Sequence, residues 1–527
     1  MIKRILAGGV LLLGSMLAVQ AQRMDNEVRE QGTKFQRLIT YVDLFYTDTV
    51  NVARLTEDAI VKMLSDLDPH SVYISREEVD DMSEQLEGGF FGIGIQFSIF
   101  QDTLMVVSVV PGGPSEKVGL LAGDRIVQVD GQNIAGVKLS NVEVRKRLKG
   151  EKGTLVKIKV MRGREFMDFN IIRDKIPLHS VDAAYMLDNA TGYLKISRFA
   201  DNTIEEFEEA IRKMQQAGMK DLVLDLQGNV GGYMGAAIGI SDNFLEDKKM
   251  IVYTEGRSSP LRQEYATSKG LLENGRLAVL VDGNSASASE IVAGAIQDWD
   301  RGLIVGRRSF GKGLVQREFP LPDNSRVRLT IAHYYTPSGR GIQKPYKEGN
   351  YREELYERYE SGELLSADSI VVNDSLKYFT KLKKRVVYGG GGIVPDLFVP
   401  IDTGTNYLYF NRLIAKNVIG EYVVGYVDKN REQLRKRYPS FDKFYKEFTI
   451  TDGMLEEIVK AGEKAGVPRD EKLFRPVVPS MKIMLKAYMA RDLWDMNEMY
   501  RVLNMDNKVL QAAQKALKDG TYEKLLK

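Results

Sequence analysis

The chain of 527 residues contains no cysteine and only three histidines, His70, His179 and His333. The absence of cysteine excludes disulfides, thiolate metal sites and cysteine nucleophiles. With so few histidines, a histidine-rich metal centre is disfavoured, and we predict neither a metal nor another cofactor. An excess of one charge is also lacking, with 74 Lys and Arg against 72 Asp and Glu. Electrostatics therefore gives no reason to expect a nucleic-acid partner.

What remains is the composition of a soluble globular protein. Hydrophobic residues make up 43% and charged residues 28% of the chain, which is ordinary for folded domains. Disorder, collagen-like repeats and a polytopic membrane protein are excluded for the chain as a whole. At roughly 100–200 residues per domain, the length predicts about three or four domains.

The first 21 residues have the pattern of an export signal. Lys3 and Arg4 precede an apolar run over 5–19, and Val19 and Ala21 are small residues suited to cleavage before Gln22. The run is short of the roughly 20 residues that a membrane span needs. We predict a signal peptide over 1–21 and a periplasmic protein, with an uncleaved membrane anchor as the alternative. No cysteine follows the run, which excludes a lipoprotein.

The remaining chain divides into four regions with different sequence patterns. Apolar spacing of 3, 4 and 7 predicts an N-terminal helical region over 22–85. Short alternating strands predict a small β-rich domain with short helices over 86–175. Strands alternating with amphipathic helices over 176–400 predict an α/β core, with 346–385 as a charged surface insertion. From about 401 to 527 the pattern is helical.

The segment N-S-A-S-A-S-E at 284–290 lies between an apolar strand and a predicted helix. A serine at such a turn can project its hydroxyl from the helix N-terminus, where free amides can stabilise an oxyanion. Ser287 is the candidate nucleophile, and Ser285 and Ser289 are the next. Ser287 and Glu290 also have the spacing of a capping box, so Ser287 could simply cap the helix.

A serine nucleophile needs a base, and Lys312 in G-K-G is the candidate. A lysine base must be neutral, and lowering its pKa from about 10.4 to about 7 costs roughly 4–5 kcal/mol, which burial would have to supply. The neighbours Phe310, Leu314 and Val315 are apolar enough for this. The alternative is a solvated lysine in a turn, and His333 would then be the next base to test.

Two glycine-rich stretches invite a nucleotide interpretation. Residues 306–312 match the first seven positions of a P-loop, but Gly313 stands where Ser or Thr must bind magnesium, and a strand pattern follows. In D-L-Q-G-N-V-G-G, Gly231 and Gly232 could offer amides to an oxyanion. This stretch is not GxGxxG; a tight strand–helix turn or dinucleotide binding are the alternatives. A nucleotide-binding enzyme is thus the least favoured class.

Taken together, residues 30–400 resemble the C-terminal processing peptidases, also called tail-specific proteases. The resemblance rests on these motifs in order: LDPHS, GGFFGIGIQF with GLLAGD, DLQGNVGG, SASASEIVAGAIQD, SFGKGLVQ, YTPSGRGIQ and GGIVPD. It implies a multidomain α/β protein: a ClpP/crotonase-like protease core with an inserted PDZ domain, preceded by a helical segment and followed by a helical extension. It implies an exported serine endopeptidase with a Ser-Lys dyad.

The resemblance assigns roles to individual residues. Ser287 corresponds to the nucleophile and Lys312 to the base, while Gln316 would orient Lys312. Asp298 matches a residue that supports the site structurally. No metal site is implied.

The oxyanion hole implied by the resemblance combines the amide of Ala288 with an amide of the Gly231–Gly232 turn, and which glycine contributes is left open. Val230 departs from the family pattern, because many members have proline there. Residues 401–527 lie outside the resemblance.

The PDZ resemblance implies that a substrate tail adds as a strand and that its carboxylate meets backbone amides. Phe91, Gly92, Ile93 and Gly94 are the predicted carboxylate loop, and Ile95 adds apolar surface; an ordinary strand bulge is the alternative. The expected partners are proteins or peptides with apolar C-termini, while an adaptor or a homo-oligomer stays open. A catalytically silent PDZ scaffold is the contrasting function, and the presence of both Ser287 and Lys312 disfavours it.

Overall fold

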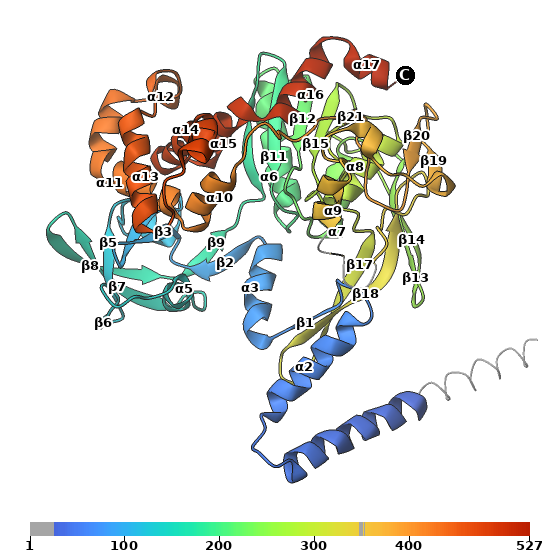
Figure 1. Cartoon of the computed structure of the whole chain (residues 1–527), viewed down its shortest axis with the longest axis horizontal. Helices are drawn as coiled ribbons and strands as arrows, with labels where there is room; N and C mark the ends of the chain where they lie inside the picture. The colour runs from blue at the N-terminus through green and yellow to red at the C-terminus, as the bar shows by residue number, and fades with distance from the viewer. Residues whose placement is uncertain (1–25, 347–350, 352–353, 527) are drawn as a thin grey trace, which may run out of the picture. The chain divides into compact units, whose positions relative to one another are not determined.

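The computed structural model describes residues 26–346, 351 and 354–526 (Figure 1). The predicted signal peptide lies outside these residues. The chain divides into two compact units, Met1–Arg76 with Gln316–Thr330, and Glu77–Val315 with Ile331–Lys527. Within the described part, no helix combines the length and hydropathy that crossing a membrane requires.

The first unit contains a helical stretch over 26–45, helix α2 (Val52–Ser65) and strand β1 (Val72–Ile74). Asn51 caps α2, because its side-chain oxygen accepts the Arg54 N–H (3.1 Å). Strand β1 pairs antiparallel with residues 326–328 of β18 (Arg326–Tyr335).

The apolar residues that predict these N-terminal helices are largely uncovered in the structure. Phe35, Leu38 and Phe45, which share one face of the 26–45 stretch, are all exposed, Phe45 to 74%. The periodicity therefore predicts the helix correctly but says nothing of what covers its apolar face.

The β-rich region of the second unit follows helix α3 (Arg76–Leu86). Its elements are β2 (Gly89–Gly92), β3 (Ile95–Phe100), β4 (Thr103–Val109), α4 (Pro114–Lys117), β5 (Arg125–Val129), β6 (Gln132–Asn133), α5 (Asn141–Leu148), β7 (Leu155–Arg162), β8 (Glu165–Ile172) and β9 (Asp174–Pro177). The main sheet has the order β3-β4-β5-β7-β8, so β3 is an edge strand. Strands β2 and β9 pair antiparallel where the chain enters and leaves the region.

The α/β core is a six-stranded sheet. In spatial order its strands are β10 (Val181–Met186), β11 (Thr191–Ile196), β12 (Asp221–Asp225), β15 (Leu277–Val281), β16 (Leu303–Gly306) and β21 (Leu397–Phe398). All neighbouring pairs are parallel except β10 with β11. Strands β12 and β15 are buried along their whole length, as expected for parallel strands covered on both faces.

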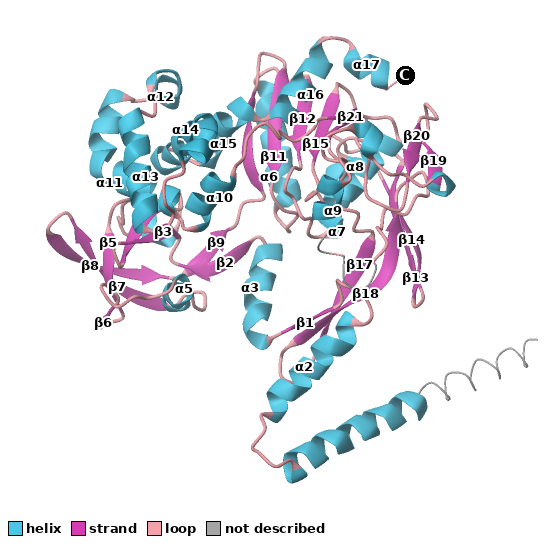
Figure 2. Ribbon diagram, in the orientation of Figure 1, coloured by secondary structure: helices cyan, strands magenta, loops and turns pink. Residues whose placement is uncertain are grey.

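Helices cover both faces of this sheet (Figure 2). The helices on one face are α6 (Thr203–Gln216), α7 (Met234–Asp242) and α8 (Ala288–Asp298); they share a core with Leu222 and Leu224. On the other face, α16 (Lys508–Lys518) and α17 (Thr521–Leu525) pack with Val223. Because side chains alternate along β12, its two faces bind helices from distant parts of the chain.

A second set of strands lies beside the core in the same unit. Strands β13 (Met250–Gly256) and β14 (Ser259–Tyr265) form a hairpin, and β13 pairs with residues 333–335 of β18. The 346–385 segment holds α9 (Glu354–Glu360), two short 3-10 turns (Ala367–Ser369, Asp374–Leu376) and β19 (Lys377–Phe379), which pairs with β20 (Val386–Tyr388).

The C-terminal region is helical from residue 408, which confirms the predicted extension. Before α16 it contains α10 (Leu408–Ala415), α11 (Val418–Arg437), α12 (Phe441–Glu447), α13 (Asp452–Lys464), α14 (Glu471–Leu493), α15 (Met496–Leu503) and a 3-10 turn (Asn504–Asp506). Phe444, Ile458, Met481 and Leu485 lie in a hydrophobic core of its own. The methionine content of α14 fills this core, as its helical spacing predicts.

Candidate active site

Ser287 lies at the turn from β15 into α8 and has a strained backbone. Its φ is 54° and its ψ is −111°, a conformation that costs a non-glycine residue about 1–3 kcal/mol. The Glu290 N–H donates to the Ser287 carbonyl (2.8 Å) and the Glu290 side chain accepts the Ser287 N–H (2.9 Å), so the two residues pair at the start of α8 as their capping-box spacing predicts. The strain places a half-buried serine at a helix N-terminus.

The buried carboxylate of Glu290 joins this turn to the G-K-G loop. One oxygen accepts the backbone N–H groups of Ser287 and Lys312, each at 2.9 Å. The other accepts the Ser309 hydroxyl (2.5 Å) and the Gly311 N–H (2.7 Å). Burial raises the pKa of Glu290, and these four hydrogen bonds act to lower it. The structure thus makes the two predicted catalytic residues neighbours in space.

Tyr334 provides a second link between the same two residues. Its buried hydroxyl lies 2.6 Å from the Lys312 carbonyl oxygen and 3.0 Å from the Ser287 carbonyl oxygen. Strand β17 (Leu314–Pro320) follows the G-K-G loop directly, where a P-loop would require a helix. Nothing in the sequence near Lys312 pointed to Tyr334.

The glycine loop after β12 packs directly against Ser287. A Cβ added to Gly231 would lie 2.8 Å from the Ser287 Cβ. The Gly231 N–H donates to the Asn229 side-chain oxygen (2.8 Å), so it is not free to bind an oxyanion. The Gly232 N–H has no acceptor among the described residues. Of these two glycines, Gly232 is therefore the one whose N–H lacks an acceptor among the described residues.

Gly232 is also the position where only glycine fits. Its φ is 149°, and a Cβ there would lie 2.0 Å from the Phe199 carbonyl oxygen. The residues before and after Gly232 both bind the backbone of Phe199. The Phe199 N–H donates to the Gly231 carbonyl (3.1 Å), and the Tyr233 N–H donates to the Phe199 carbonyl (2.8 Å).

Asn229 holds the glycine loop and the serine turn together, a role that the sequence did not reveal. It is fully buried, and its side-chain amide donates to the Ile196 carbonyl (2.9 Å). Its own carbonyl accepts the Ala286 N–H (3.0 Å) and the Ser289 hydroxyl (2.8 Å). Ser285, equally buried, donates to the Leu226 carbonyl (2.8 Å). Ser285 and Ser289 are therefore part of the scaffold.

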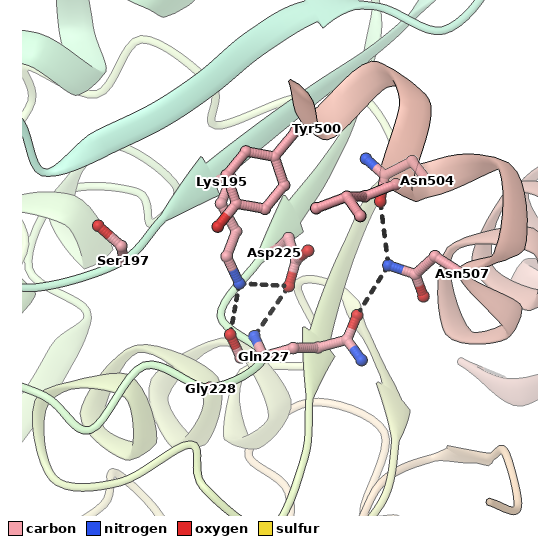
Figure 3. Close-up of a pocket in the computed structure, with 9 residues that line it drawn as sticks. Lys195, Ser197, Asp225, Gln227, Gly228, Tyr500, Asn504 and Asn507 are labelled. Atoms are coloured by element: carbon pink, nitrogen blue, oxygen red, sulfur yellow. Dashed lines mark hydrogen bonds and ion pairs between the residues drawn. The ribbon is translucent and has the colours of Figure 1, made fainter. Parts of the chain in front are cut away.

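A pocket of about 400 Å³ beside the base of this loop shows how the loop is anchored (Figure 3). The Lys195 ammonium group contacts the Asp225 carboxylate (3.2 Å) and the Gln227 carbonyl. From the C-terminal extension, Asn507 donates its side-chain amide to the Gln227 side chain (3.1 Å). Tyr500 also lines the pocket. The extension therefore contacts the loop that carries Gly232.

Gln316 and Asp298 both have structural partners. Gln316 donates its side-chain amide to the His70 carbonyl in the L-D-P-H-S turn. Asp298 is fully buried, forms an ion pair with Arg340 (2.8 Å) and accepts the Ser338 N–H (2.8 Å). Their assigned roles, orienting Lys312 and supporting the site, stay predictions.

The 346–385 segment is more than a surface insertion. Arg358 of α9 is buried and donates to the Ser309 carbonyl (2.9 Å), just before the G-K-G loop. Glu363, also buried, pairs with Arg308 (2.5 Å). Most described residues of the segment are exposed, as expected of a charged surface insertion, but these two charges turn inward, and Arg358 binds the backbone just before the G-K-G loop.

A second cavity, of about 480 Å³, lies at the start of β3. Gly92, Ile93 and Gly94 line it, as the sequence predicts, but Phe91 does not. Phe91 is 42% exposed, and Phe90 lines the cavity in its place. The physical reason is the alternation of β2, whose successive side chains point to opposite faces.

Three cationic side chains surround this cavity, and none was predicted. Arg145 and Lys149 come from the end of α5, and Arg198 comes from the loop after β11. Lys149 forms an ion pair with Glu84. In the described part of the chain, Arg145 and Arg198 have no carboxylate within ion-pair distance.

Three parts of the chain match known protein families. Residues 190–350 match the model of peptidase family S41, 92–172 match the PDZ domain, and 409–495 match a family of unknown function, DUF8443. The carboxy-terminal-processing protease of Bartonella bacilliformis is 37% identical over 358 residues, covering 65% of this chain and 81% of that protein.

Two further proteins show the same similarity. The carboxy-terminal processing protease CtpB of Bacillus subtilis is 30% identical and covers 70% of this chain and 78% of its own. A solved structure of the photosystem II D1 C-terminal processing protease is 32% identical, covers 59% and 83% of the two chains, and has a TM-score of 0.34. The fold and site define a serine-type peptidase with an inserted PDZ domain. The chain belongs to peptidase family S41, with the carboxy-terminal processing proteases.

The Tyr334 link is tested by Tyr334→Phe, which removes only the hydroxyl. The Lys312 carbonyl then loses its close hydrogen-bond donor, while the Ser287 carbonyl keeps the N–H groups of Glu290 and Ile291, and we expect a loss of about 1–3 kcal/mol in the free energy of unfolding. We also expect kcat to fall more than tenfold while KM changes little, because the substitution shifts Ser287 relative to Lys312. Denaturant unfolding and peptide-cleavage kinetics measure the two effects.

Tyr335→Phe is the matched control, since Tyr335 is the next residue on β18 and stacks on Tyr253 through its ring. It should keep parental activity and stability. Parental kcat in Tyr334→Phe would show that the hydroxyl does not position the two residues.

Proposed function

We propose that Ser287 and Lys312 form the catalytic dyad of this peptidase. The observation that supports it is the Glu290 carboxylate, which accepts the backbone N–H groups of both residues at 2.9 Å. In the reaction, the Ser287 Oγ attacks the scissile carbonyl carbon and its proton passes to the Lys312 amine. Lys312 then returns the proton to the leaving amine, and a water molecule hydrolyses the acyl-enzyme ester.

The amides of Ala288 and Gly232 are the proposed oxyanion hole. Ala288 is the first residue of α8, so its N–H has no partner within the helix. The Gly232 N–H is likewise free of an acceptor among the described residues. Both can donate to the oxygen that becomes negative during attack, and such donors contribute about 3–4 kcal/mol each to transition-state stabilisation.

The dyad is tested by Ser287→Ala and Lys312→Arg. We expect both variants to lose cleavage, the first because the nucleophile is gone and the second because guanidinium stays protonated. In the parent, activity should rise with pH, since only the neutral amine accepts a proton. Cleavage of a peptide substrate and labelling by a serine-reactive fluorophosphonate probe measure the effects. Near-parental turnover in either variant would remove that residue from its role.

Ser287→Gly serves as a stability control for the same position. Glycine adopts a φ of 54° without strain, so this variant should be inactive yet more stable than Ser287→Ala by about 1 kcal/mol. A glycine variant of equal or lower stability would argue that the backbone at 287 is not strained.

We further propose that the PDZ domain recognises the free C-terminus of the substrate. The cavity at Gly92–Gly94 lies at the start of edge strand β3, where an added strand would end. Arg145 and Arg198 supply positive charge for a terminal carboxylate, and Phe90 and Ile95 supply apolar surface. Charge-assisted hydrogen bonds to an ionised group are among the strongest in proteins.

Tail recognition is tested with two peptides that differ only in a free or an amidated C-terminus. The free acid should be cleaved faster, because amidation removes the charge and keeps every side chain. Arg145→Gln should reduce the difference, whereas Arg164→Gln, at an exposed turn of the same domain, should leave it unchanged. Equal cleavage of acid and amide by the parent would contradict recognition of the terminus.

Export to the periplasm is the third part of the proposal, and it is supported by the basic start and apolar run of residues 1–21. Mass spectrometry of the protein from its native cells should give Gln22 as the first residue of the mature chain. Recovery of the intact N-terminus in the membrane fraction would instead support the uncleaved anchor.

A further inference from the structure

The C-terminal extension packs against the PDZ domain on the side that carries β3 and β4. Arg125 and Asp428 of α11 form an ion pair (2.7 Å) that is only partly exposed. Met105 and Val107 of β4 form a small hydrophobic cluster with Val424, and Phe100 packs against it. The two regions are therefore joined by both apolar and charged contacts.

One face of α11 is turned to the PDZ domain. The residues on this face follow helical spacing: Asn417, Gly420, Glu421, Val424, Gly425 and Asp428. Gly425 is part of the close approach, because a Cβ there would lie 3.0 Å from the Phe100 ring. Gly425 therefore lets α11 lie close to Phe100 at the end of β3.

Between this face and β3 lies a third cavity, of about 580 Å³. On the PDZ side it is lined by Gln96, Ser98 and Ile99 of β3 and by Asn141 at the start of α5. On the extension side it is lined by Glu421 and Val424 of α11 and by Tyr488 and Arg491 of α14.

Phe97 lines both this cavity and the predicted carboxylate cavity. The two hollows therefore adjoin at the Phe97 side chain of β3. A tail that pairs antiparallel with β3 and ends at Gly92–Gly94 would run toward Phe100. At about 3.3 Å per residue, roughly its third to sixth residues from the end would lie in the cavity that the extension lines.

We propose that α11 and α14 of the extension form the outer wall of the substrate-tail groove and select the residues upstream of the terminus. This inference rests on the proposed recognition of tails by the PDZ domain. It assigns a specificity role to a region of the chain that matches only a family of unknown function.

The charges on this wall define the tail that fits it. Arg491 is already paired with Asp492 (2.8 Å) and stacks over the Tyr488 ring (4.9 Å). Glu421 is exposed, and no cation lies within ion-pair distance of it in the described part of the chain. An exposed carboxylate without an ion-pair partner favours a lysine or arginine in the tail and disfavours an acidic residue.

The test measures binding of fluorescent peptides to the full-length chain carrying Ser287→Ala, which prevents cleavage. The peptides share an apolar residue with a free carboxylate at the end and carry Lys or Glu in turn at the third to sixth position from it. We expect the Lys peptide to bind about two- to fivefold more tightly at one or more of these positions, as measured by fluorescence anisotropy.

Glu421→Gln should remove this preference and Glu421→Lys should reverse it. Glu432→Lys is the matched control, because Glu432 is an exposed residue three turns further along α11 and lines none of the cavities described here; it should keep the preference for Lys. Equal binding of Lys and Glu peptides, or an unchanged preference in Glu421→Lys, would overturn the role of the extension.

An amidated copy of the preferred peptide separates the role of the extension from the proposed recognition of the free C-terminus by the PDZ domain. If acid and amide bind equally, recognition of the terminus itself fails, and the proposed groove fails with it. If the acid binds more tightly but the Glu421 variants change nothing, only the role of the extension fails.

Discussion

The Glu290 carboxylate is the constraint around which the site is built. A carboxylate without access to water is stable only if its lone pairs are filled, and here two peptide loops and a serine hydroxyl fill them. Because the donors come from both loops, neither can move away without leaving a buried charge unpaired. The Ser287 backbone can therefore be held in a strained conformation, since the interactions around it outweigh the cost.

Elsewhere in the site, too, side chains from distant parts of the sequence form hydrogen bonds with the backbone of the loops. Asn229 closes the glycine loop onto the serine turn, and Arg358 supplies donors to the carbonyls that precede Gly311. Lys195 and Asn507 hold the base of the glycine loop. The peptidase core thus depends on the 346–385 segment and on the extension, although the match to peptidase family S41 ends at residue 350.

Local sequence patterns predicted the serine turn, the glycine loop and the order of strands and helices. An apolar strand that ends in small residues before an amphipathic helix can be recognised from the sequence alone. They could not predict Tyr334 or Arg358, whose partners lie more than 20 residues away and are set by packing. Glu290 was interpreted only as a capping residue, since helical spacing reveals its contact with Ser287 but not the one with Lys312. That Phe90 rather than Phe91 lines the cavity could not be predicted, because the register of β2 depends on its pairing with β9.

The position of Asn507 in the chain has a consequence for the timing of activity. It follows every other residue of the site in sequence, and α16, which covers one face of the central sheet, begins directly after it. During synthesis the glycine loop therefore lacks its last anchor, and the sheet lacks one of its two layers, until these residues have emerged. A partly made chain contains Ser287 and Lys312 without the packing that holds their loops in place.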